Sequence, residues 1–322
     1  VTGPEAESYS NPTLLYGKTI EKIIKIRSQL VRSVFTLSIK EARRSNKLLD
    51  LTRELAISSC PVDTEVKFNK PLKPRLKFDG ILAPAGPSGS VVDLKVVGNP
   101  IVPSKVDYVI SDYDLEAVKA IEELYGAGIS VYYTTRLLSL GMLGRAKDRL
   151  LVPSRWSITA TDANVANFLR KKIIDFDELN QIQLFTQKYV GNHYQVLLLP
   201  STLSFELVEI WLPDSLYTPG ATRAFIGSDC ESWKGRTTFS IAGGGYYAMK
   251  LPTYEYLYSI RRQAFVFAIR EVTPEYWAPL GSWKIREALR AAFNSQPKKF
   301  NKVEDALKDM TSGLITPFNE WF

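Results

Sequence analysis

The chain has 322 residues, of which 45% are hydrophobic and 23% charged, a composition that excludes a largely disordered protein and allows a substantial core. Its net charge of +7 favours an anionic partner, but does not distinguish DNA, RNA, a nucleotide or an acidic protein. Two cysteines, Cys60 and Cys230, and one histidine, His193, exclude a zinc site built from four Cys or His ligands. We therefore expect no zinc finger, while a divalent metal ion held by carboxylates stays open and any other cofactor is unknown.

No apolar run approaches the roughly 20 residues that a membrane span needs, so we expect no membrane partner and a soluble protein. Two widely separated cysteines and no secretory signal fit a reducing, cytoplasmic compartment. Residues 1–60 are expected to form a basic helical segment, because apolar residues from Lys18 to Ile57 follow helical spacing. Ten basic and four acidic side chains lie in that range. Such an arm could follow a phosphate backbone, and a solvated helix face accounts for the charges equally well.

Residues 61–200 are expected to form a mixed α/β domain. Short β-like runs occur around 76–82 and 91–97, a helix is expected over Asp114–Tyr125 and a strand over Ile129–Tyr133. This alternation predicts a partly parallel sheet with a crossover helix. Further on, β-rich runs between residues 181 and 211, separated by turn residues, predict an antiparallel meander.

The stretch from Arg155 to Asp162 has the most specific chemistry of the chain. Ser157, Thr159 and Thr161 alternate with apolar residues, which predicts a strand with one hydroxyl face, and Asp162 is expected to cap the following helix. An arginine, hydroxyls and a carboxylate at a strand-to-helix junction suit an anionic group. A solvated strand face followed by an ordinary helix cap is the alternative.

A C-terminal α+β domain is expected over 201–310, with its informative residues between 229 and 262. Three glycines after an acidic and basic run are expected to form a tight turn that lets the backbone approach a ligand, with Tyr246 and Tyr247 to stack on a base. A glycine bulge with core tyrosines fits equally well. A helix over Tyr254–Arg270 would place two arginines in an apolar segment, where they need an acidic partner or an anion. These residues are Asp229, Glu231, Arg236, Gly243, Gly244, Gly245, Tyr246, Arg261 and Arg262.

Helices are also expected over Ser282–Phe293 and Val303–Met310, followed by a tail over 311–322. Phe318, Trp321 and Phe322 would lie on one side of a helical turn, as in the peptides that dock on the sliding clamp, although Ile315 stands where such peptides usually have glutamine. A tail docked on its own core is the alternative.

Several motifs in the same order resemble the archaeal Nre family of DNA-repair proteins, from about Pro61 to the last residue. They are GMLGRAKDRLLVP, VPSRWSITATD, AGGGYYA and SIRRQAFVFAIREVTPEYWAPLGSWKIREALR. The resemblance implies a role in repair of DNA damage, close to the nucleoid, and in one branch of the family recruitment by the sliding clamp, PCNA, through a C-terminal peptide. Some members have a cysteine-rich N-terminal segment that resembles a zinc finger, and this chain departs from them.

The sequence thus predicts a mixed α/β (α+β) protein and leaves three functions open. The leading one is a repair protein, recruited to the clamp by its tail, that binds DNA or a nucleotide-like group in one basic cleft. The second is a hydrolase acting on a nucleotide or an ADP-ribose-like adduct, with Asp162, Asp229 or Glu231 as acid, base or metal ligand. The third is a scaffold without catalysis that bridges clamp and DNA. The cleft of the first hypothesis would be formed by Arg155, Ser157, Thr159, Thr161, Asp162, Arg236, Gly243, Gly244, Gly245, Tyr246, Arg261 and Arg262.

Overall fold

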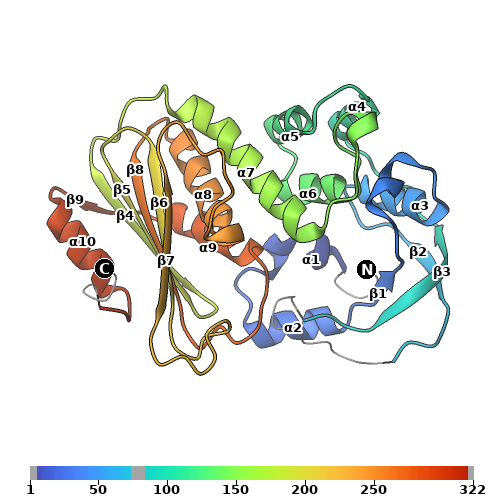
Figure 1. Ribbon diagram of the computed structural model, residues 1–322, viewed down its shortest axis with the longest axis horizontal. Coiled ribbons are helices and arrows are strands. Elements are labelled where there is room, and N and C mark those ends of the chain that lie inside the picture. The colour runs from blue at the N-terminus through green and yellow to red at the C-terminus, as the bar shows by residue number, and fades with distance from the viewer. Residues whose placement is uncertain (1–5, 74–83, 318–322) are drawn as a thin grey trace. The chain divides into compact units, whose positions relative to one another are not determined.

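A computed structural model describes residues 6–73 and 84–317 and has a mixed α/β fold, as predicted (Figure 1). The chain divides into two compact units. The first comprises Val1–Leu15, Glu21–Phe78 and Pro84–Val165, and the second comprises Ala166–Phe322 with the short segments Tyr16–Ile20 and Asp79–Ala83.

The first unit combines short helices with a three-stranded sheet of order β1-β3-β2. Strand β3 runs parallel to β1 and antiparallel to β2. The elements in this part of the chain are α1 (Ala6–Ser10), η1 (Pro12–Leu15), α2 (Ile20–Ser28), β1 (Arg32–Val34), η2 (Ile39–Arg43), α3 (Lys47–Ala56), β2 (Thr64–Phe68), β3 (Ser88–Val96), α4 (Ser104–Ser111), α5 (Ala117–Gly126), α6 (Val131–Ser139) and η3 (Ala146–Asp148).

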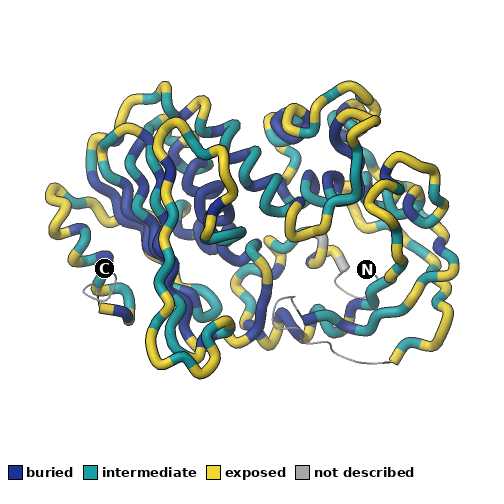
Figure 2. The backbone as a smooth tube through the Cα atoms, viewed as in Figure 1, coloured by how far each residue is buried: buried dark blue, intermediate teal, exposed yellow. Residues whose placement is uncertain are grey.

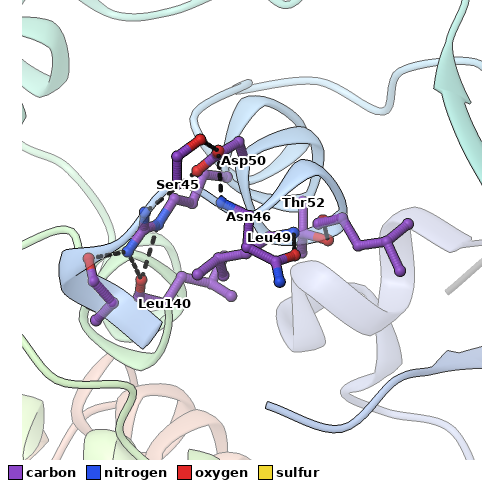
Figure 3. Close-up of polar contacts among 9 residues, drawn as sticks. Ser45, Asn46, Leu49, Asp50, Thr52 and Leu140 are labelled. Atoms are coloured by element: carbon purple, nitrogen blue, oxygen red, sulfur yellow. Dashed lines mark hydrogen bonds and ion pairs between the residues drawn. The ribbon is translucent and has the colours of Figure 1, made fainter. Parts of the chain in front are cut away.

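Side-chain caps explain where two of these helices begin. Asn46 precedes α3, and its Oδ1 accepts a hydrogen bond from the N–H of Leu49, as Figure 3 shows. Ser130 precedes α6, and its Oγ accepts from the N–H of Tyr133. The strand expected over Ile129–Tyr133 is therefore wrong: the β-formers of this run are overridden by the cap and by the buried apolar positions that follow at helical spacing.

Two other expectations for the first unit are only partly met. The range Lys18–Ile57 holds α2 and α3, but also β1 and the short 3-10 helix η2, so it is not α-helical throughout. The run around residues 91–97 is confirmed as β3, whereas the run around 76–82 lies outside the described residues. No parallel pair joined by the helix over 117–126 forms among the strands described in this unit.

The stretch expected to be a hydroxyl strand is the first half of α7 (Ser154–Ile173), a helix of 20 residues that crosses from the first unit into the second. Ser157 Oγ donates to the Ser154 carbonyl at 3.0 Å, and Thr159 Oγ1 donates to the Arg155 carbonyl at 3.1 Å. Because these hydroxyls bond to the preceding turn, they fit inside a helix without other partners. Asp162 is consequently a buried mid-helix residue, and no strand-to-helix junction exists at this place.

The second unit is built on a six-stranded sheet of order β7-β6-β8-β5-β4-β9, in which β6 and β8 run parallel and all other neighbours antiparallel. Helices α8 and α9 cover one face and α10 the other (Figure 1). The remaining elements are β4 (Ile182–Tyr189), β5 (Asn192–Leu199), β6 (Ser204–Trp211), β7 (Phe225–Glu231), α8 (Gly243–Ser259), β8 (Phe265–Val272), α9 (Trp283–Phe293), β9 (Lys298–Phe300) and α10 (Val303–Ser312).

Alternating side chains of this sheet build a core on both of its faces. Leu184, Leu197 and Ile269 pack in one buried cluster with Met310 of α10. On the other face Phe185 lies edge-on to rings of α8 and α9, with centroids 5.0 and 4.9 Å apart. Figure 2 shows the central strands and α8 as the most buried part of this unit.

Several expectations for the second unit need correction. The hairpin of β4 and β5 is confirmed, but β6 pairs with β7 and β8, so the meander is wrong at its third strand. The glycine run is the first turn of α8 and not a separate turn. The helix expected over Tyr254–Arg270 ends at Ser259, because Arg261 adopts a positive φ of 53° and the apolar run after it forms β8. The helices expected near the C-terminus are confirmed as α9 and α10.

Candidate functional site

Several residues singled out from the sequence lie together between β7 and the start of α8. Asp229 and Glu231 are two positions apart on β7, so both side chains lie on the same side of the strand. Tyr246, Lys250 and Tyr254 follow one another at intervals of four on α8 and share one helix face. We call these residues, with Arg236 and Arg170, the Glu231 cluster.

A buried ion pair forms the centre of the Glu231 cluster. Lys250 Nζ lies 2.6 Å from Glu231 Oε1, and the two side chains are 1% and 0% exposed. The hydroxyl of Tyr254 donates to the same carboxylate oxygen at 3.3 Å. Burial lowers the pKa of Lys250, and the charge of Glu231 only partly opposes that shift. Removing two charges from water is costly, so this ion pair is weak evidence for a role in stability alone. It marks a chemically specific site.

A second ion pair closes one side of the cluster. Arg236 Nη2 lies 2.7 Å from Asp229 Oδ2, which also accepts hydrogen bonds from Ser240 Oγ at 2.6 Å and from the N–H of Ile241 at 3.0 Å. Burial raises the pKa of Asp229, but the hydrogen bonds from Ser240 and Arg236 outweigh it and hold this pKa below its usual value. The Arg236 guanidinium also lies 4.8 Å from the ring centre of Tyr246. Asp229 is thus saturated with donors.

Four buried polar atoms of the Glu231 cluster have no hydrogen-bond partner among the described residues. They are Arg170 Nε, Arg236 Nη1, Glu231 Oε2 and the Tyr246 hydroxyl. Burial and then the charge of Glu231 raise the pKa of Tyr246, so its hydroxyl keeps its proton. Buried polar atoms are almost always satisfied by protein or by ordered water. Three donors and one acceptor therefore suit water or a small polar group, and three cations against two carboxylates favour an anion.

The glycine run has a different role from the one expected. A Cβ on Gly245 would lie only 2.4 Å from Glu209 Oε1. That carboxylate accepts a hydrogen bond from Arg270 Nη1 at 2.8 Å, and Arg270 Nε donates to Asn192 Oδ1 at 2.9 Å. Lys284 Nζ donates to the same amide oxygen at 2.9 Å, and burial followed by repulsion from Arg270 lowers its pKa well below the usual value. The run thus brings α8 against a buried ion pair and not, among the described residues, against an open ligand site.

The structure does not bring Arg236 and Arg262 together. Arg262 follows the C-terminal end of α8, where it pairs with exposed Asp177 at 3.3 Å, and Arg261 lies 5.8 Å from the ring centre of Phe176. Arg236 contacts Tyr246 in the first turn of α8. A helix of 17 residues separates these ends by about 25 Å. Both arginines also have carboxylate partners, so the single basic cleft expected from the sequence does not form within the second unit.

The residues expected near Arg155 divide into buried and exposed ones. Ser157, Thr161 and Asp162 are 0–1% exposed, and Thr159 is half-buried. Arg155 is exposed with no carboxylate within 4.0 Å among the described residues, and its neighbour Trp156 is 69% exposed. Of the residues expected in the cleft here, Arg155 in the first turn of α7 is therefore the one that is fully accessible to a partner.

Exposed cations gather around that turn within the first unit. Arg43 Nε donates to the Arg149 carbonyl at 3.0 Å, and the N–H of Leu151 donates to the Ile39 carbonyl at 2.9 Å, so η2 lies beside the segment that leads into α7. Glu41 offsets part of this charge through its ion pair with Arg44 at 3.6 Å, and Asp148 is also exposed nearby. The exposed residues are Ile39, Lys40, Arg43, Arg44, Lys147, Arg155 and Trp156, and we call them the η2–α7 surface.

The C-terminal tail is anchored where its described part ends. Ile315 is 60% exposed, but its N–H and that of Thr316 donate to the carboxylate of Glu271 at 2.7–2.9 Å. Glu271 is fully buried and lies across from His193 in the sheet, with His193 Nδ1 2.9 Å from its Oε2. Phe318, Trp321 and Phe322 lie outside the described residues.

Within the ranges 6–73 and 84–317, no three or more His, Cys, Asp or Glu side chains are grouped so that they could hold a metal ion. None of the described helices has both the length and the apolar character needed to cross a membrane. Sequence reasoning missed Lys250, Tyr254 and Arg170, and their spacing from Tyr246 identifies the first two only once α8 is known to begin at Gly243.

Comparison with known proteins gives one family. The family models "Archaeal Nre, N-terminal" and "Archaeal Nre, C-terminal" match residues 1–218 and 231–322. DNA repair protein NreA of Archaeoglobus fulgidus is 37% identical over 290 residues, which cover 90% of this chain and 73% of that protein. DNA repair protein NreB of the same organism is 33% identical, over 94% of this chain and 76% of that protein. DNA repair protein NreA of Haloferax volcanii is 32% identical, over 96% and 76%. No solved structure matches the chain.

Proposed function

Because the chain belongs to the archaeal Nre family, we propose that it acts in DNA repair, contacts DNA through the η2–α7 surface and is recruited by the sliding clamp through its C-terminal peptide. The names of its relatives support the repair role. The two finer parts of the proposal are supported by the chain's own residues.

One observation supports DNA contact most directly. Arg155 and Trp156 are both exposed, and they lie among other exposed cations that have no buried partners. Lysine and arginine side chains attract phosphates and release counterions, which makes binding depend steeply on salt. An exposed indole offers a face on which an unpaired base can stack, a contribution of about 1–3 kcal/mol per base. With Trp156 69% exposed beside Arg155, single-stranded DNA is the better fit for this surface.

The test measures binding of a fluorescently labelled single strand by anisotropy over a range of salt concentrations. Replacing Lys147 and Arg155 by alanine is expected to weaken binding and to lower the slope of log affinity against log salt by about 1 to 2. Trp156→Ala is expected to weaken binding without changing that slope. Lys308→Ala and Trp233→Ala, which are exposed positions of the second unit, are the matched controls. Equal affinities and slopes for all variants would remove DNA contact from this surface.

Recruitment by the clamp is supported by the aromatic residues of the tail. Phe318, Trp321 and Phe322 are apolar, closely spaced and preceded by Ile315, and such residues favour burial in a groove of a partner. Replacing the three aromatic residues by alanine is expected to abolish calorimetric binding to PCNA and to leave thermal unfolding unchanged. Phe239→Ala, at a residue 64% exposed elsewhere, is the control. Unchanged affinity for PCNA would refute recruitment through this peptide.

A hydrolase acting on a nucleotide or an ADP-ribose-like adduct is the second candidate, and one observation favours it. Glu231 Oε2 is buried without a hydrogen-bond partner beside the buried Lys250, whereas Asp229 is saturated by donors. An enzyme using this cluster would have Glu231 as its acid or base. Mass spectrometry of an ADP-ribosylated oligonucleotide should then show turnover that Glu231→Gln abolishes. Repair activity lost on tail removal but retained in every variant of the body would instead favour the scaffold.

A further inference from the structure

The first unit contains a cavity of about 730 Å³ that none of the sequence motifs indicates. Its walls come from α3, α6, β2, β3 and the segment 59–63, and every lining residue belongs to the first unit. Small-molecule sites typically have volumes of about 300–1,000 Å³, so the cavity is of the right size for a ligand.

The walls of this cavity are held in place by a half-buried arginine that does not line it. Arg53 of α3 donates to the carbonyl of Ala42 at 2.8 Å and to the carbonyl of Leu140, just after α6, at 3.1 Å. Leu140 and Thr52 of α3 both line the cavity, and Figure 3 shows the polar contacts that join these parts. The hydrogen bonds fix α3 and the end of α6 relative to each other, which preforms the cavity.

The chemistry of the cavity centres on Arg136 of α6. Its Nη2 donates to the Ser58 carbonyl at 2.9 Å, and its guanidinium lies 4.4 Å from the ring centre of Tyr133. Its Nε is buried without a hydrogen-bond partner, and no carboxylate lies within 4.0 Å among the described residues. Burial lowers the pKa of Arg136, while Tyr133 opposes the shift. A guanidinium removed from water without a carboxylate is energetically costly unless an anion binds it.

Other charges near the cavity do not replace that anion. Glu7 and Asp63 line it, but both are exposed, so water screens them. Gly128, Ile129 and Ser130 also line it, which places the positive end of the α6 dipole at the same wall as Arg136. The inner wall is therefore electropositive while the rim is acidic and polar.

Apolar residues form much of the remaining wall, among them Leu55, Val62 and Leu94. The ligand must then combine an anionic end with a flat or apolar body that also has polar groups, because Asn11, Thr52 and Thr64 line the cavity as well. A fatty acid has no polar groups along its chain, whereas a nucleotide has a phosphate and a planar base with amino or imide N–H groups. We propose that this cavity binds a nucleotide, with its phosphate at Arg136 and the start of α6 and its base between the apolar walls and the rim.

The test uses the full chain and two probes, deoxyadenosine and thymidine 5′-monophosphate, in calorimetry and in thermal unfolding. At millimolar concentration at least one is expected to release heat and to raise the Tm. The nucleosides without phosphate should bind at least about tenfold more weakly, because they lack the charge-assisted hydrogen bonds between the phosphate and Arg136. A 5′-phosphorylated trinucleotide that competes would identify the source as a strand, and one that does not would identify a free nucleotide.

Arg136→Met separates a binding role from a structural one. It is expected to weaken nucleotide binding at least tenfold and to leave the Tm of the ligand-free protein unchanged or higher, because it removes an unpaired charge. Val62→Phe, which fills the cavity and keeps Arg136, should also abolish binding. Arg43→Met of the η2–α7 surface should leave mononucleotide binding unchanged, so failure of DNA contact and failure of this proposal are distinguishable. No heat from either probe, or equal binding by wild type and Arg136→Met, would overturn the proposal.

Discussion

Replacing Glu231 by glutamine removes the carboxylate that faces Lys250, whose side chain is 1% exposed. Breaking a buried ion pair by removing one partner costs about 3–5 kcal/mol, because the remaining charge has no compensation. The lysine can escape that cost only by losing its proton. From the ordinary lysine pKa of 10.5, this requires about 4.8 kcal/mol at pH 7, which sets an upper bound of the same size.

The same bound fixes how the effect depends on pH. Burial lowers the pKa of Lys250 in the folded protein, so the unfolded chain binds more protons between that lowered pKa and 10.5. The unfolding free energy therefore rises with pH across this window. Glu231→Gln removes the charge that opposes the lowering of the Lys250 pKa. This pKa then falls further, and the pH range over which the unfolding free energy rises becomes wider. At pH 9 removing the proton from lysine requires only about 2 kcal/mol, which lowers the upper bound on the destabilisation to the same value. The difference in unfolding free energy between variant and wild type should therefore be smaller at pH 9.

Urea unfolding at pH 7, 8 and 9 measures both quantities. Glu275→Gln, the same change at an exposed residue, should stay within about 0.5 kcal/mol of wild type. The double variant Glu231→Gln, Lys250→Met should recover most of the loss, because neither charge is then left alone. A loss below about 1 kcal/mol at pH 7, or a difference that is the same at pH 9, would refute the assignment of an uncompensated lysine.

Three further predictions address other parts of the second unit and a matched helix of the first. Gly245→Ala should lower the unfolding free energy by about 1–3 kcal/mol, because its Cβ would lie 2.4 Å from Glu209 Oε1. The control is Gly126→Ala, which should change the unfolding free energy little because no atom lies within 4 Å of its Cβ. Equal effects of the two substitutions would contradict the argument. Asp229→Asn should destabilise at pH 7, and urea unfolding should show the effect disappearing in acid: the pKa of Asp229 lies below 3.8, so its contribution is complete above that pH and lost as pH falls through the lowered value. Glu271→Gln should speed hydrogen exchange at the Ile315 and Thr316 amides at least about tenfold, by mass spectrometry, whereas unchanged rates would show that the carboxylate is no anchor.

Secondary structure could be predicted from the sequence where the apolar residues fit either the helical or the strand spacing, but not both. The apolar spacing in α9 and α10 fits a helix and no strand, and both were predicted. The run from Ser157 to Thr161 also fits a strand, because Ser and Thr alternate with other residues there. What decides for a helix is hydrogen bonding of the Ser157 and Thr159 hydroxyls to the preceding turn, together with buried Val165 and Leu169 further along.

The candidate site was predictable only through local spacing. Asp229 and Glu231 face the same way because they are two residues apart on a strand. Lys250 was missed because the glycine run and Tyr246 were expected to form a turn and not the start of a helix. Without a helix, the four-residue spacing between Tyr246 and Lys250 does not indicate a shared face. The contact between Glu209 and Arg270 depends on the register of two parallel strands that are neighbours in space and distant in sequence. No local pattern specifies such a register.

The attachment of Ile315 and Thr316 to Glu271 fixes the point at which the tail leaves the sheet. From Thr316 to Trp321 there are five residues, which can extend by at most about 18 Å. A protein that captures Trp321 must therefore come within that distance of the end of β8. So short a tether keeps the local concentration of the two bodies in the millimolar range and restricts the angles from which they can meet. Capture by this peptide would thus orient the molecule as well as hold it.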